Sequence, residues 1–478
     1  MQASRTVQQV PGVSAALVAM ATELNLELLA GMGFAAPQEA GPNDLLVAIR
    51  CADEARDAAL AALAGALESG PAGGVSGGGG ERPPRTIGSA AARSGATLAL
   101  VSVPGRHAFV EAMDALEAGL SVLVFSDGVP LAQEVLLKEE AARRDLLVMG
   151  PDCGTAIVAG TGLGFANVVR PGPVGIVAAS GTGAQQLCCL LDAAGVGISH
   201  VLGVGGRDLS TEVAARSTLQ ALAALSADPA TEVVVVVSKP PAAEVAARVQ
   251  AAADELGKPV VMCLLGRGRP DLTATAAEAL RTAGVEVPTW PHWPAREARE
   301  PQEPRAGFLR GLFCGGTLCD EAMIIATAAL GPIASNIPLQ PDWTLDGTMR
   351  APGHLMIDFG DDALTAGRPH PMIDPSLRTE RLLAEARDPT TAVVLLDVVL
   401  GHGAAPDPAG DLAPAIAGAR ATAAADGRGL AVVVSLCGTE GDPQGRDRQA
   451  GALAAVGAAV FGSNAEAARH AAALVRPR

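Results

Sequence analysis

Glycine-rich turns that directly follow apolar runs are the parts of this chain best suited to chemistry. The apolar run at 174–177 ends in such a turn, which leads into a helical pattern. A buried strand that turns through small residues into a helix presents free backbone N–H groups at the positive end of the helix dipole. The sequence therefore predicts a site for an anion, typically phosphate, at this turn. Its residues are Ser180, Gly181, Thr182 and Gly183.

Three further turns follow strands of the same predicted sheet, and in doubly wound sheets ligands bind where the strands end. Lys239 follows a run of five valines and Ser238, and we interpret it as anion-binding rather than as a solvated or salt-bridged surface lysine. Arg207 and Asp208 either bind the ligand or form a structural ion pair. The other predicted binding residues of this part are Asp152, Cys153, Gly154, Thr155, Gly205 and Gly206.

Residues 307–478 show the same plan of strand, glycine turn and helix. The loop at 367–372 carries Arg368 and His370, which either bring a cation and a titratable group to the substrate or belong to a surface turn. Asp361 and Asp362 suit helix N-capping better than a divalent metal, so we predict no metal site. The predicted phosphate-binding residues here are Gly315, Gly316, Thr317, Gly401, His402, Gly403, Ala404, Gly438, Thr439 and Glu440.

Composition restricts the class of protein and its partners. Of the 478 residues, 49% are apolar and 18% are charged, which is typical of a globular enzyme. A net charge of −16 argues against nucleic acid and anionic membranes as partners, so local cations and helix ends must build any site for a small anionic substrate. Because we find no signal-like hydrophobic segment and no apolar run of about 18 residues, we expect a soluble, cytoplasmic protein. The eight cysteines form no CxxC pair and are expected to be reduced, buried thiols.

Strand and helix patterns alternate along the chain, which predicts an α/β fold with parallel sheets and crossover helices. One strand is expected just before Pro11. Glycine, proline and charged residues concentrate in two segments that are typical of linkers. The expected parts are a small α/β domain at 1–70, a linker at 71–85, α/β segments at 86–150 and 151–288, a linker at 289–306 and an α/β domain at 307–478.

From Arg85 onward the chain resembles the succinyl-CoA synthetase superfamily. TIGSAAARSGATLALVSVP is similar to the later part of the α subunit's CoA-binding domain, and GPDCGTAIVAG, PVGIVAASGTG, VGGRDLS and DPATEVVVVVSKP follow in the order of its ligase domain. Residues from 307 onward look like the carboxy-terminal domain of the β subunit. The resemblance implies a partial Rossmann-like, CoA-binding-like domain at 86–150 and flavodoxin-like, ligase-like domains at 151–288 and 307–478. In that family a phosphorylated intermediate sits between two opposed helix N-termini, which the resemblance places after 180–183 and after 401–404.

Three departures from that family change the expected chemistry. The family's catalytic histidine follows the strand equivalent to 259–265, where this chain reads GRGRPDLTATAAEA without a histidine. Lys239 replaces the glutamate that orients the phosphohistidine, which suits a bound phosphate better than a covalent carrier. The glycine-rich loop for the CoA phosphates and the nucleotide-grasp domain are also missing. The chain by itself is therefore not expected to perform nucleotide-driven CoA ligation.

The whole chain looks like the FdrA family, whose members have been linked to allantoin (purine) breakdown as a subunit of oxamate carbamoyltransferase. The resemblance rests on the segments at 150–155, 164–167, 180–183, 205–209, 238–241, 367–375 and 438–444. It implies conversion of oxalurate and phosphate into oxamate and carbamoyl phosphate, with partner subunits and no cofactor beyond inorganic phosphate as co-substrate.

In this hypothesis the turns at 180–183 and 401–404 hold phosphate, while Lys239 and Arg207 neutralise charge. Arg368 or His370 then faces the oxalurate carboxylate or the leaving nitrogen. Two other functions stay open. An acyl-CoA synthetase subunit of the succinyl-CoA ligase type needs CoA and a partner with a nucleotide site. A non-catalytic scaffold or regulatory subunit binds an acyl phosphate or carboxylate without turnover.

Overall fold

The computed structural model describes residues 2–21, 25–26, 29–30, 32–35, 37, 40–41, 44–68, 84–296, 304–365 and 368–476. Two compact units make up the chain: Met1–Pro83 with Ala366–Arg368, and Pro84–Thr365 with Pro369–Arg478. Most of the linker expected at 71–85 lies outside the described residues. Within the described part, no helix combines the length and the apolar character that crossing a membrane requires.

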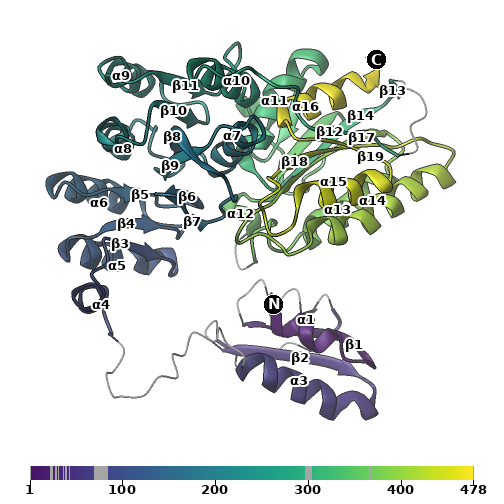
Figure 1. The fold of residues 1–478 in the computed structure, drawn as a ribbon. Coiled ribbons are helices and arrows are strands. Elements are labelled where there is room, and N and C mark those ends of the chain that lie inside the picture. The colour runs from purple at the N-terminus through teal and green to yellow at the C-terminus, as the bar shows by residue number, and fades with distance from the viewer. Residues whose placement is uncertain are drawn as a thin grey trace. The chain divides into compact units, whose positions relative to one another are not determined.

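The first unit consists of two antiparallel strands and the helices that pack on them (Figure 1). Val7, Ala16, Val18, Ala59 and Leu63 form its buried cluster. The strand expected before Pro11 is instead a helix, because residues 2–8 show no alternation of apolar and polar side chains and Val7 is their one hydrophobic core residue. The elements are α1 (Gln2–Gln8), β1 (Val13–Met20), β2 (Leu45–Cys51), η1 (Asp53–Ala55) and α3 (Arg56–Glu68).

The second unit begins with a three-stranded parallel sheet in the order β3-β4-β5. Thr86 and Ser89 cap the first helix reciprocally through their side chains and backbone N–H groups. Gly105 permits a close approach, since a Cβ there would stand 2.1 Å from the carbonyl oxygen of Asp127. The elements are α4 (Ile87–Ser94), β3 (Leu98–Val101), α5 (Gly105–Glu117), β4 (Ser121–Val124), α6 (Leu131–Arg143) and β5 (Val148–Met149).

A six-stranded sheet follows in the order β11-β10-β8-β9-β6-β7. Strands β8 to β11 run parallel, and the five valines of β10 are all buried, as expected for a strand covered on both faces. The antiparallel hairpin β6–β7 was not indicated by the sequence pattern. The elements are β6 (Thr155–Val158), β7 (Thr161–Gly164), β8 (Pro171–Ala179), α7 (Gly181–Ala193), β9 (Ile198–Gly203), α8 (Arg216–Ala227), β10 (Val233–Ser238), α9 (Ala243–Asp254), β11 (Val260–Leu264) and α10 (Leu272–Thr282).

A seven-stranded sheet in the order β12-β19-β18-β17-β14-β16-β15 forms the rest of this unit. All its strands are parallel except β12, which comes from the segment expected as a linker and pairs with β19. Its strands and the short β13–β20 pair are β12 (His292–Trp293), β13 (Arg305–Ala306), β14 (Phe308–Phe313), β15 (Ile333–Ser335), β16 (His354–Asp358), β17 (Thr391–Val399), β18 (Ala431–Cys437), β19 (Ala458–Phe461) and β20 (Val475–Arg476). Its helices are α11 (Gly316–Leu330), η2 (Pro341–Trp343), α12 (Asp362–Thr365), α13 (Ser376–Arg387), α14 (Pro408–Ala425), α15 (Arg446–Ala455) and α16 (Asn464–Ala473).

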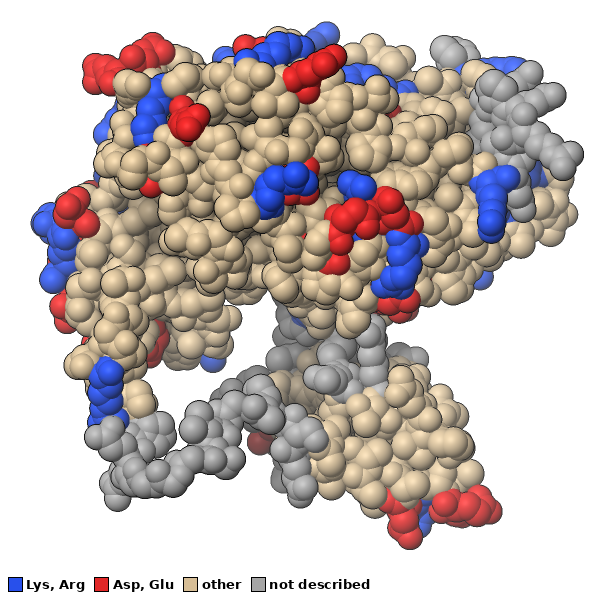
Figure 2. Space-filling model, viewed as in Figure 1, with Lys and Arg blue, Asp and Glu red and all other residues tan. Residues whose placement is uncertain are grey.

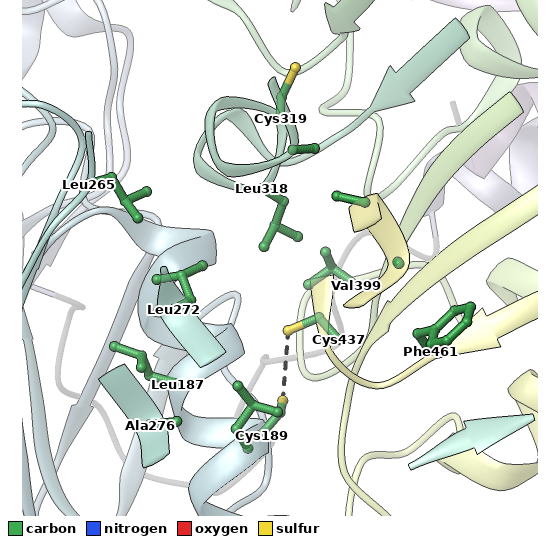
Figure 3. Packing of buried hydrophobic residues seen from close by; sticks show 14 of the residues in the cluster. Leu187, Cys189, Leu265, Leu272, Ala276, Leu318, Cys319, Val399, Cys437 and Phe461 are labelled. Atoms are coloured by element: carbon green, nitrogen blue, oxygen red, sulfur yellow. Dashed lines mark hydrogen bonds between the residues drawn. The ribbon is translucent and has the colours of Figure 1, made fainter. Parts of the chain in front are cut away.

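One apolar core joins the two larger sheets. It includes Leu187 and Cys189 of α7 together with Leu318 of α11, and Figure 3 shows these side chains around Cys437 at the end of β18. The sulfur atoms of Cys189 and Cys437 lie 3.7 Å apart across this contact. All eight cysteines are free thiols, and seven of them are buried. Since interiors of this kind are close-packed, the shared core fixes α7 and α11 relative to each other.

Charged side chains lie in small groups of both signs on the face shown in Figure 2, and most of that face is uncharged. Among the described residues, three cations are buried in the interior instead, each against a carboxylate. Losing one partner of such a pair is strongly destabilising. The pairs are Lys138–Glu134, Arg310–Glu385 and Arg378–Asp397.

Candidate functional site

Two turns meet at the switch point of the six-stranded sheet. The chain starts this parallel sheet at β8, places β9 on one side of it and places β10 and β11 on the other. The loops after β8 and β10 therefore leave the sheet in opposite directions, and the space between them is where open α/β sheets bind ligands. Ser180 follows β8, and Lys239 follows β10.

The turn after β8 is shaped as a helix start with small side chains. The Ser180 hydroxyl caps α7 by accepting from the Gly183 N–H at 2.9 Å. A Cβ on Gly183 would stand 2.4 Å from that hydroxyl oxygen, so glycine is required there. Thr155, which lies beside Gly181, donates to the carbonyl of Phe165 and is thus occupied in holding the β6–β7 hairpin.

A second helix start lies at the switch point of the seven-stranded sheet, where β14 has β16 on one side and β17 on the other. The turn into α11 is held by Asp397, a fully buried residue of β17. Its carboxylate accepts from the N–H groups of Cys314 and Gly315 at 2.7 and 2.8 Å and pairs with Arg378 at 2.6 Å. Because these bonds use the N–H groups that precede the helix, the first turn of α11 keeps its own N–H groups for another acceptor.

The two helix starts face each other directly. The Ser180 hydroxyl lies 2.6 Å from the Thr317 hydroxyl. A Cβ on Gly315 would stand 2.8 Å from the Thr182 methyl group, and one on Gly316 would stand 3.0 Å from the Lys239 ammonium group. The positive ends of α7 and α11 and one lysine therefore converge at one place, where glycine lets them approach closely, and this combination suits a small anion.

The carboxylates of Asp320 and Asp358 lie close to Lys239. The ammonium group lies 3.7 Å from Asp320, a residue of the first turns of α11. Burial lowers the pKa of Lys239, but the charges of Asp320 and Asp358 outweigh burial and the net shift is upward. Burial raises the pKa of Asp320 to about 6 and that of Asp358 to about 7, in both cases against the opposing effect of Lys239. Lys239 is therefore a cation at neutral pH, beside carboxyl groups that can take up protons.

His370 approaches the same place from the loop before α13. Its Nδ1 accepts from the Met372 N–H at 3.2 Å, which leaves the proton of a neutral ring on Nε2. Burial, with a smaller contribution from Arg378, lowers the pKa of His370 to about 4, so the ring is neutral at pH 7. The ring packs on Phe165, with the centroids 5.5 Å apart. His370 can thus donate a hydrogen bond but carries no charge.

Asp208 belongs to a buried ion network, which the half-exposed Arg207 joins from its edge. The Lys138 ammonium group is fully buried and lies 2.7 Å from Asp208 and 2.8 Å from Glu134. Glu134 also pairs with Arg207 at 2.8 Å. Asp208 accepts further bonds from Ser217 and Thr218 at the start of α8. Arg207 thus joins α6 to the turn at 205–208 through Glu134, and its expected role in neutralising the ligand stays a prediction.

The turn at 401–404 does not lead into an opposed helix, because α14 begins only at Pro408. A Cβ on Gly401 would stand 2.5 Å from the Ala166 carbonyl oxygen, and the His402 N–H donates to that carbonyl at 2.8 Å. Gly403 packs against Phe165, and the His402 side chain is exposed. The expectation of a phosphate cradle at Gly401, His402, Gly403 and Ala404 is corrected: this turn docks on the segment after β7.

The turn at 438–440 is also a docking contact. The Thr439 hydroxyl donates to the Val168 carbonyl at 2.7 Å, and the Thr439 N–H donates to Asp442 at 2.8 Å. Gly438 packs against Leu400. Glu440 is exposed and accepts from the Asp447 N–H at the start of α15. Strong internal hydrogen bonds occupy the polar groups that were expected to bind phosphate here.

Six other sequence-predicted residues make no clear contact with the two helix starts. Cys153 is buried, and burial raises the pKa of its thiol to about 12, so it is a poor nucleophile. Gly154 packs near Phe165, and Gly205 packs on Pro151. Gly206 lies beside the exposed Asp152, whose charge reaches Lys239. Arg368 is assigned to the first compact unit, whereas His370 is assigned to the second.

Sequence reasoning missed Asp320 and gave no role to Asp358, which begins the polar run at 358–362. Asp358 is the last residue of β16, and a polar residue at the end of an apolar strand is the signal that singled out Lys239. Attention went instead to Asp361 and Asp362, of which Asp361 caps α12 through the Ala363 N–H. Among the residues that the structure describes, no group of three or more potential ligands is arranged to hold a metal ion.

Family comparisons agree with this architecture. Residues 312–474 match the CoA-ligase model, residues 169–266 match the CoA binding domain model, and residues 1–83 match the model of the AllF heavy metal-associated domain. Soft metals prefer thiolate, thioether or imidazole ligands, and residues 1–83 contain one cysteine, Cys51, three methionines and no histidine, without the paired thiolates that hold a heavy metal firmly. The donors of this segment therefore do not fit a heavy-metal site.

Several known proteins are similar to the chain. The protein YahF of Escherichia coli strain K12 is 38% identical over 97% of this chain and 93% of its own length. Succinate–CoA ligase (ADP-forming) subunit alpha 1 of Archaeoglobus fulgidus is 34% identical over 25% of this chain and 43% of its length. Malate–CoA ligase subunit alpha of Methylorubrum extorquens is 28% identical over 42% of this chain and 75% of its length.

A solved structure of ATP citrate lyase from Methanothrix soehngenii, in complex with citrate and coenzyme A, aligns over 42% of this chain and 38% of that chain. The sequence identity is 22% and the TM-score is 0.32. The near full-length similarity to YahF is the decisive comparison. The chain therefore belongs to the protein family of YahF, and it carries CoA-binding and CoA-ligase domains of the succinyl-CoA synthetase type.

Proposed function

We propose that this chain is the subunit of a CoA-ligase-type enzyme that binds an acyl phosphate without covalent attachment and passes its acyl group to a nucleophile, with CoA as the first candidate. The observation that carries this proposal is the opposition of the first turns of α7 and α11 around Lys239. Two helix dipoles and one ammonium group suit a phosphoryl group, which brings negative charge and several acceptor oxygens. Any nucleotide site belongs, in this proposal, to a partner subunit.

The loop after β11 supports binding in place of covalent phosphorylation. In the resembled family a histidine there carries the phosphoryl group, whereas this chain has Arg267 and Arg269 on an exposed turn. Lys239 stands where that family keeps a glutamate. An ammonium group repels an imidazolium but stabilises a phosphate, so the site is arranged for an acyl phosphate that arrives from solution or from a partner.

Carbamoyl transfer is the second candidate function. The lack of a histidine in the segment 266–279, directly after β11, favours it, because phosphorolysis of oxalurate requires neither a nucleotide nor a phosphohistidine. The match of residues 1–83 to the AllF domain model agrees with the resemblance to the FdrA family. In this function the acceptor of the carbamoyl group is the amide nitrogen of oxamate, and CoA takes no part.

The two functions can be distinguished by incubating the full-length protein with one acyl-phosphate donor and one acceptor in each assay. We expect acetyl phosphate and carbamoyl phosphate to bind, measured by calorimetry and by thermal stabilisation. Thioester formation from acetyl phosphate and CoA supports the first function, and phosphate release that depends on oxamate and carbamoyl phosphate supports the second. Binding without either reaction, also in the presence of candidate partner subunits, indicates a scaffold. Failure of both donors to bind overturns the proposal.

Gly316→Ala is expected to weaken binding of carbamoyl phosphate by about tenfold, or about 1.4 kcal/mol. The new Cβ would stand 2.7 Å from Asp358 Oδ2 and 3.0 Å from Lys239 Nζ, so both groups must move out of place. Gly347→Ala is the matched control, since nothing lies within 4 Å of a Cβ at that position. Equal dissociation constants for the two variants would remove Gly316 from the site.

Sulfate affinity is expected to fall as the pH rises from about 6 to about 8, by up to about tenfold per pH unit above pH 7. Burial raises the pKa of Asp358 to about 7, so this carboxyl is neutral below that pH and repels an anion above it. Sulfate keeps a constant charge over this range, so the change reports on the protein. Calorimetry at several pH values measures it, and a flat profile would show that Asp358 does not face the anion.

A further inference from the structure

Asp358 lies close both to Lys239 at the start of α11 and to His370. It ends β16, its exposed fraction is 5%, and its Oδ1 accepts from the Gly360 N–H at 2.9 Å. Its Oδ2 lies 2.7 Å from the position of a Cβ on Gly316, at the start of α11. Among the described residues, no hydrogen bond or ion pair to this oxygen is found. One oxygen of a buried carboxylate is thus anchored, and the other lies against Gly316 at the start of α11, close to the Lys239 ammonium group.

His370 lies on the other side of the same carboxyl group. A Cβ on Gly360 would stand 2.8 Å from His370 Nε2, 3.1 Å from Asp358 Oδ1 and 2.6 Å from the Cys314 carbonyl oxygen. The N–H of the neutral imidazole therefore lies close to the carboxylate and to the turn that precedes α11. A proton acceptor and a neutral donor are placed within a few ångströms of each other beside the predicted anion.

We propose that Asp358 is the catalytic acid–base group that takes the proton from the attacking acceptor and returns it to the leaving phosphate, while His370 donates to the acyl carbonyl oxygen. This inference rests on the proposed function and adds the residues that perform the transfer. It holds for either acceptor, because the thiol of CoA and the amide of oxamate each lose one proton on acylation.

The step balances as follows for an acceptor X–H. The lone pair of X attacks the acyl carbon, and Asp358 removes the proton from X. The bond between the acyl carbon and the bridging phosphate oxygen breaks, and its electron pair stays on phosphate. Protonated Asp358 then delivers the proton to the phosphate, so that acyl phosphate and X–H become acyl–X and hydrogen phosphate. The step uses no oxidant and no further co-reactant.

The charges around Asp358 suit this role. Burial raises its pKa to about 7; Lys239 and the Gly360 N–H oppose this effect, and Asp397 of β17 and Asp320 of α11 add to it. The other titratable groups near it are His370, which is neutral at pH 7, and the buried thiol of Cys319 on α11, whose pKa is raised by burial. Acid–base groups work best when their pKa lies near the operating pH.

The other two carboxylates near Lys239 are less suited to this role. Asp320 lies 3.7 Å from the ammonium group, so its charge is engaged in positioning the lysine. Desolvation also raises the pKa of Asp152 to about 7, but this residue is exposed to solvent, and among the described residues no contact brings it to the start of α11. Asp358 alone among these three combines deep burial at the strand end with an oxygen aimed at the start of α11.

Asp358→Asn tests the assignment, with the exposed Asp346→Asn in the same domain as the control. The asparagine keeps an acceptor oxygen for the Gly360 N–H, so the fold is expected to survive, checked by circular dichroism. We expect unchanged or tighter binding of carbamoyl phosphate and a loss in kcat of roughly 10²–10⁴-fold. At saturating donor, the rise of kcat with pH that ionisation of Asp358 gives should disappear in this variant and persist in Asp346→Asn.

Acyl transfer to hydroxylamine, compared with transfer to CoA or oxamate, distinguishes a catalytic role of Asp358 from a purely structural one. Hydroxylamine attacks acyl groups without a base, so its protein-dependent transfer rate, corrected for the reaction in buffer, should be retained in Asp358→Asn while transfer to CoA or oxamate is lost. A variant that keeps its kcat and its pH profile overturns the role of Asp358 and leaves the proposed function standing. A wild-type protein that binds no acyl phosphate overturns the proposed function itself.

Discussion

Lys239→Met is expected to lower kcat/KM for acyl-phosphate-dependent transfer by roughly 10²–10³-fold while leaving the fold intact. The ammonium group stands at the start of α11, opposite the start of α7, where the leaving phosphate gains charge. Nearby carboxylates keep the pKa of Lys239 above its usual value, so the positive charge is present throughout the accessible pH range. Methionine keeps an unbranched side chain only one atom shorter and removes that charge.

Arg281→Met is the control for this prediction. Arg281 forms an exposed ion pair with Glu278 on α10, and such pairs contribute little to stability. Steady-state rates at several donor concentrations separate weaker binding from slower transfer, and calorimetry measures binding directly. If Lys239→Met and Arg281→Met turn over at the same rate, Lys239 takes no part in the reaction.

Lys138→Met is expected to reduce the free energy of unfolding of the second unit by about 3–5 kcal/mol. The lysine is fully buried and is the shared partner of Glu134 and Asp208, at 2.8 and 2.7 Å. Without it Asp208 keeps only uncharged partners, in an interior where an uncompensated carboxylate is costly. The loss should affect the docking of α6 on the turn at 205–208.

The measurement is urea unfolding followed by circular dichroism, with hydrogen exchange at α6 and α8 to locate the loss. Arg144→Met serves as the control, because Arg144 pairs with Glu140 on the surface of the same helix. A loss below about 1 kcal/mol, similar to that of the control, would mean that the network contributes no more than a surface ion pair.

The alternation of apolar runs and helical patterns was sufficient to predict the α/β fold. Runs such as 233–237 and 392–396 became the buried strands β10 and β17, since a strand covered on both faces must be apolar throughout. Short edge elements were missed, among them the β6–β7 hairpin and β12. Their few residues carry too little pattern to distinguish a strand from a loop.

For the candidate site, too, only part of the arrangement could be predicted from the sequence. Lys239 and the turns at 180–183 and 315–317 were recognisable because each follows an apolar strand, and the structure brings them together. The turns at 205–208, 401–404 and 438–440 have the same local pattern but are occupied by internal ion pairs, backbone contacts and hydrogen bonds. The local sequence shows that polar groups follow a strand. It does not show which of these groups form hydrogen bonds or ion pairs within the protein and are therefore not free to bind a ligand.

By itself the sequence determined the class of fold and the strand–turn–helix units that present N–H groups. It also showed that the segment directly after β11, at 266–279, contains no histidine. Only the tertiary structure decided which helix start opposes α7. That choice depends on the order of the strands, with β14 between β16 and β17, and on the shared core that holds α11 against α7. Both arise from contacts between residues far apart in the chain, for which a local pattern carries no information. The same contacts bury Asp358 beside Lys239 and so set its pKa.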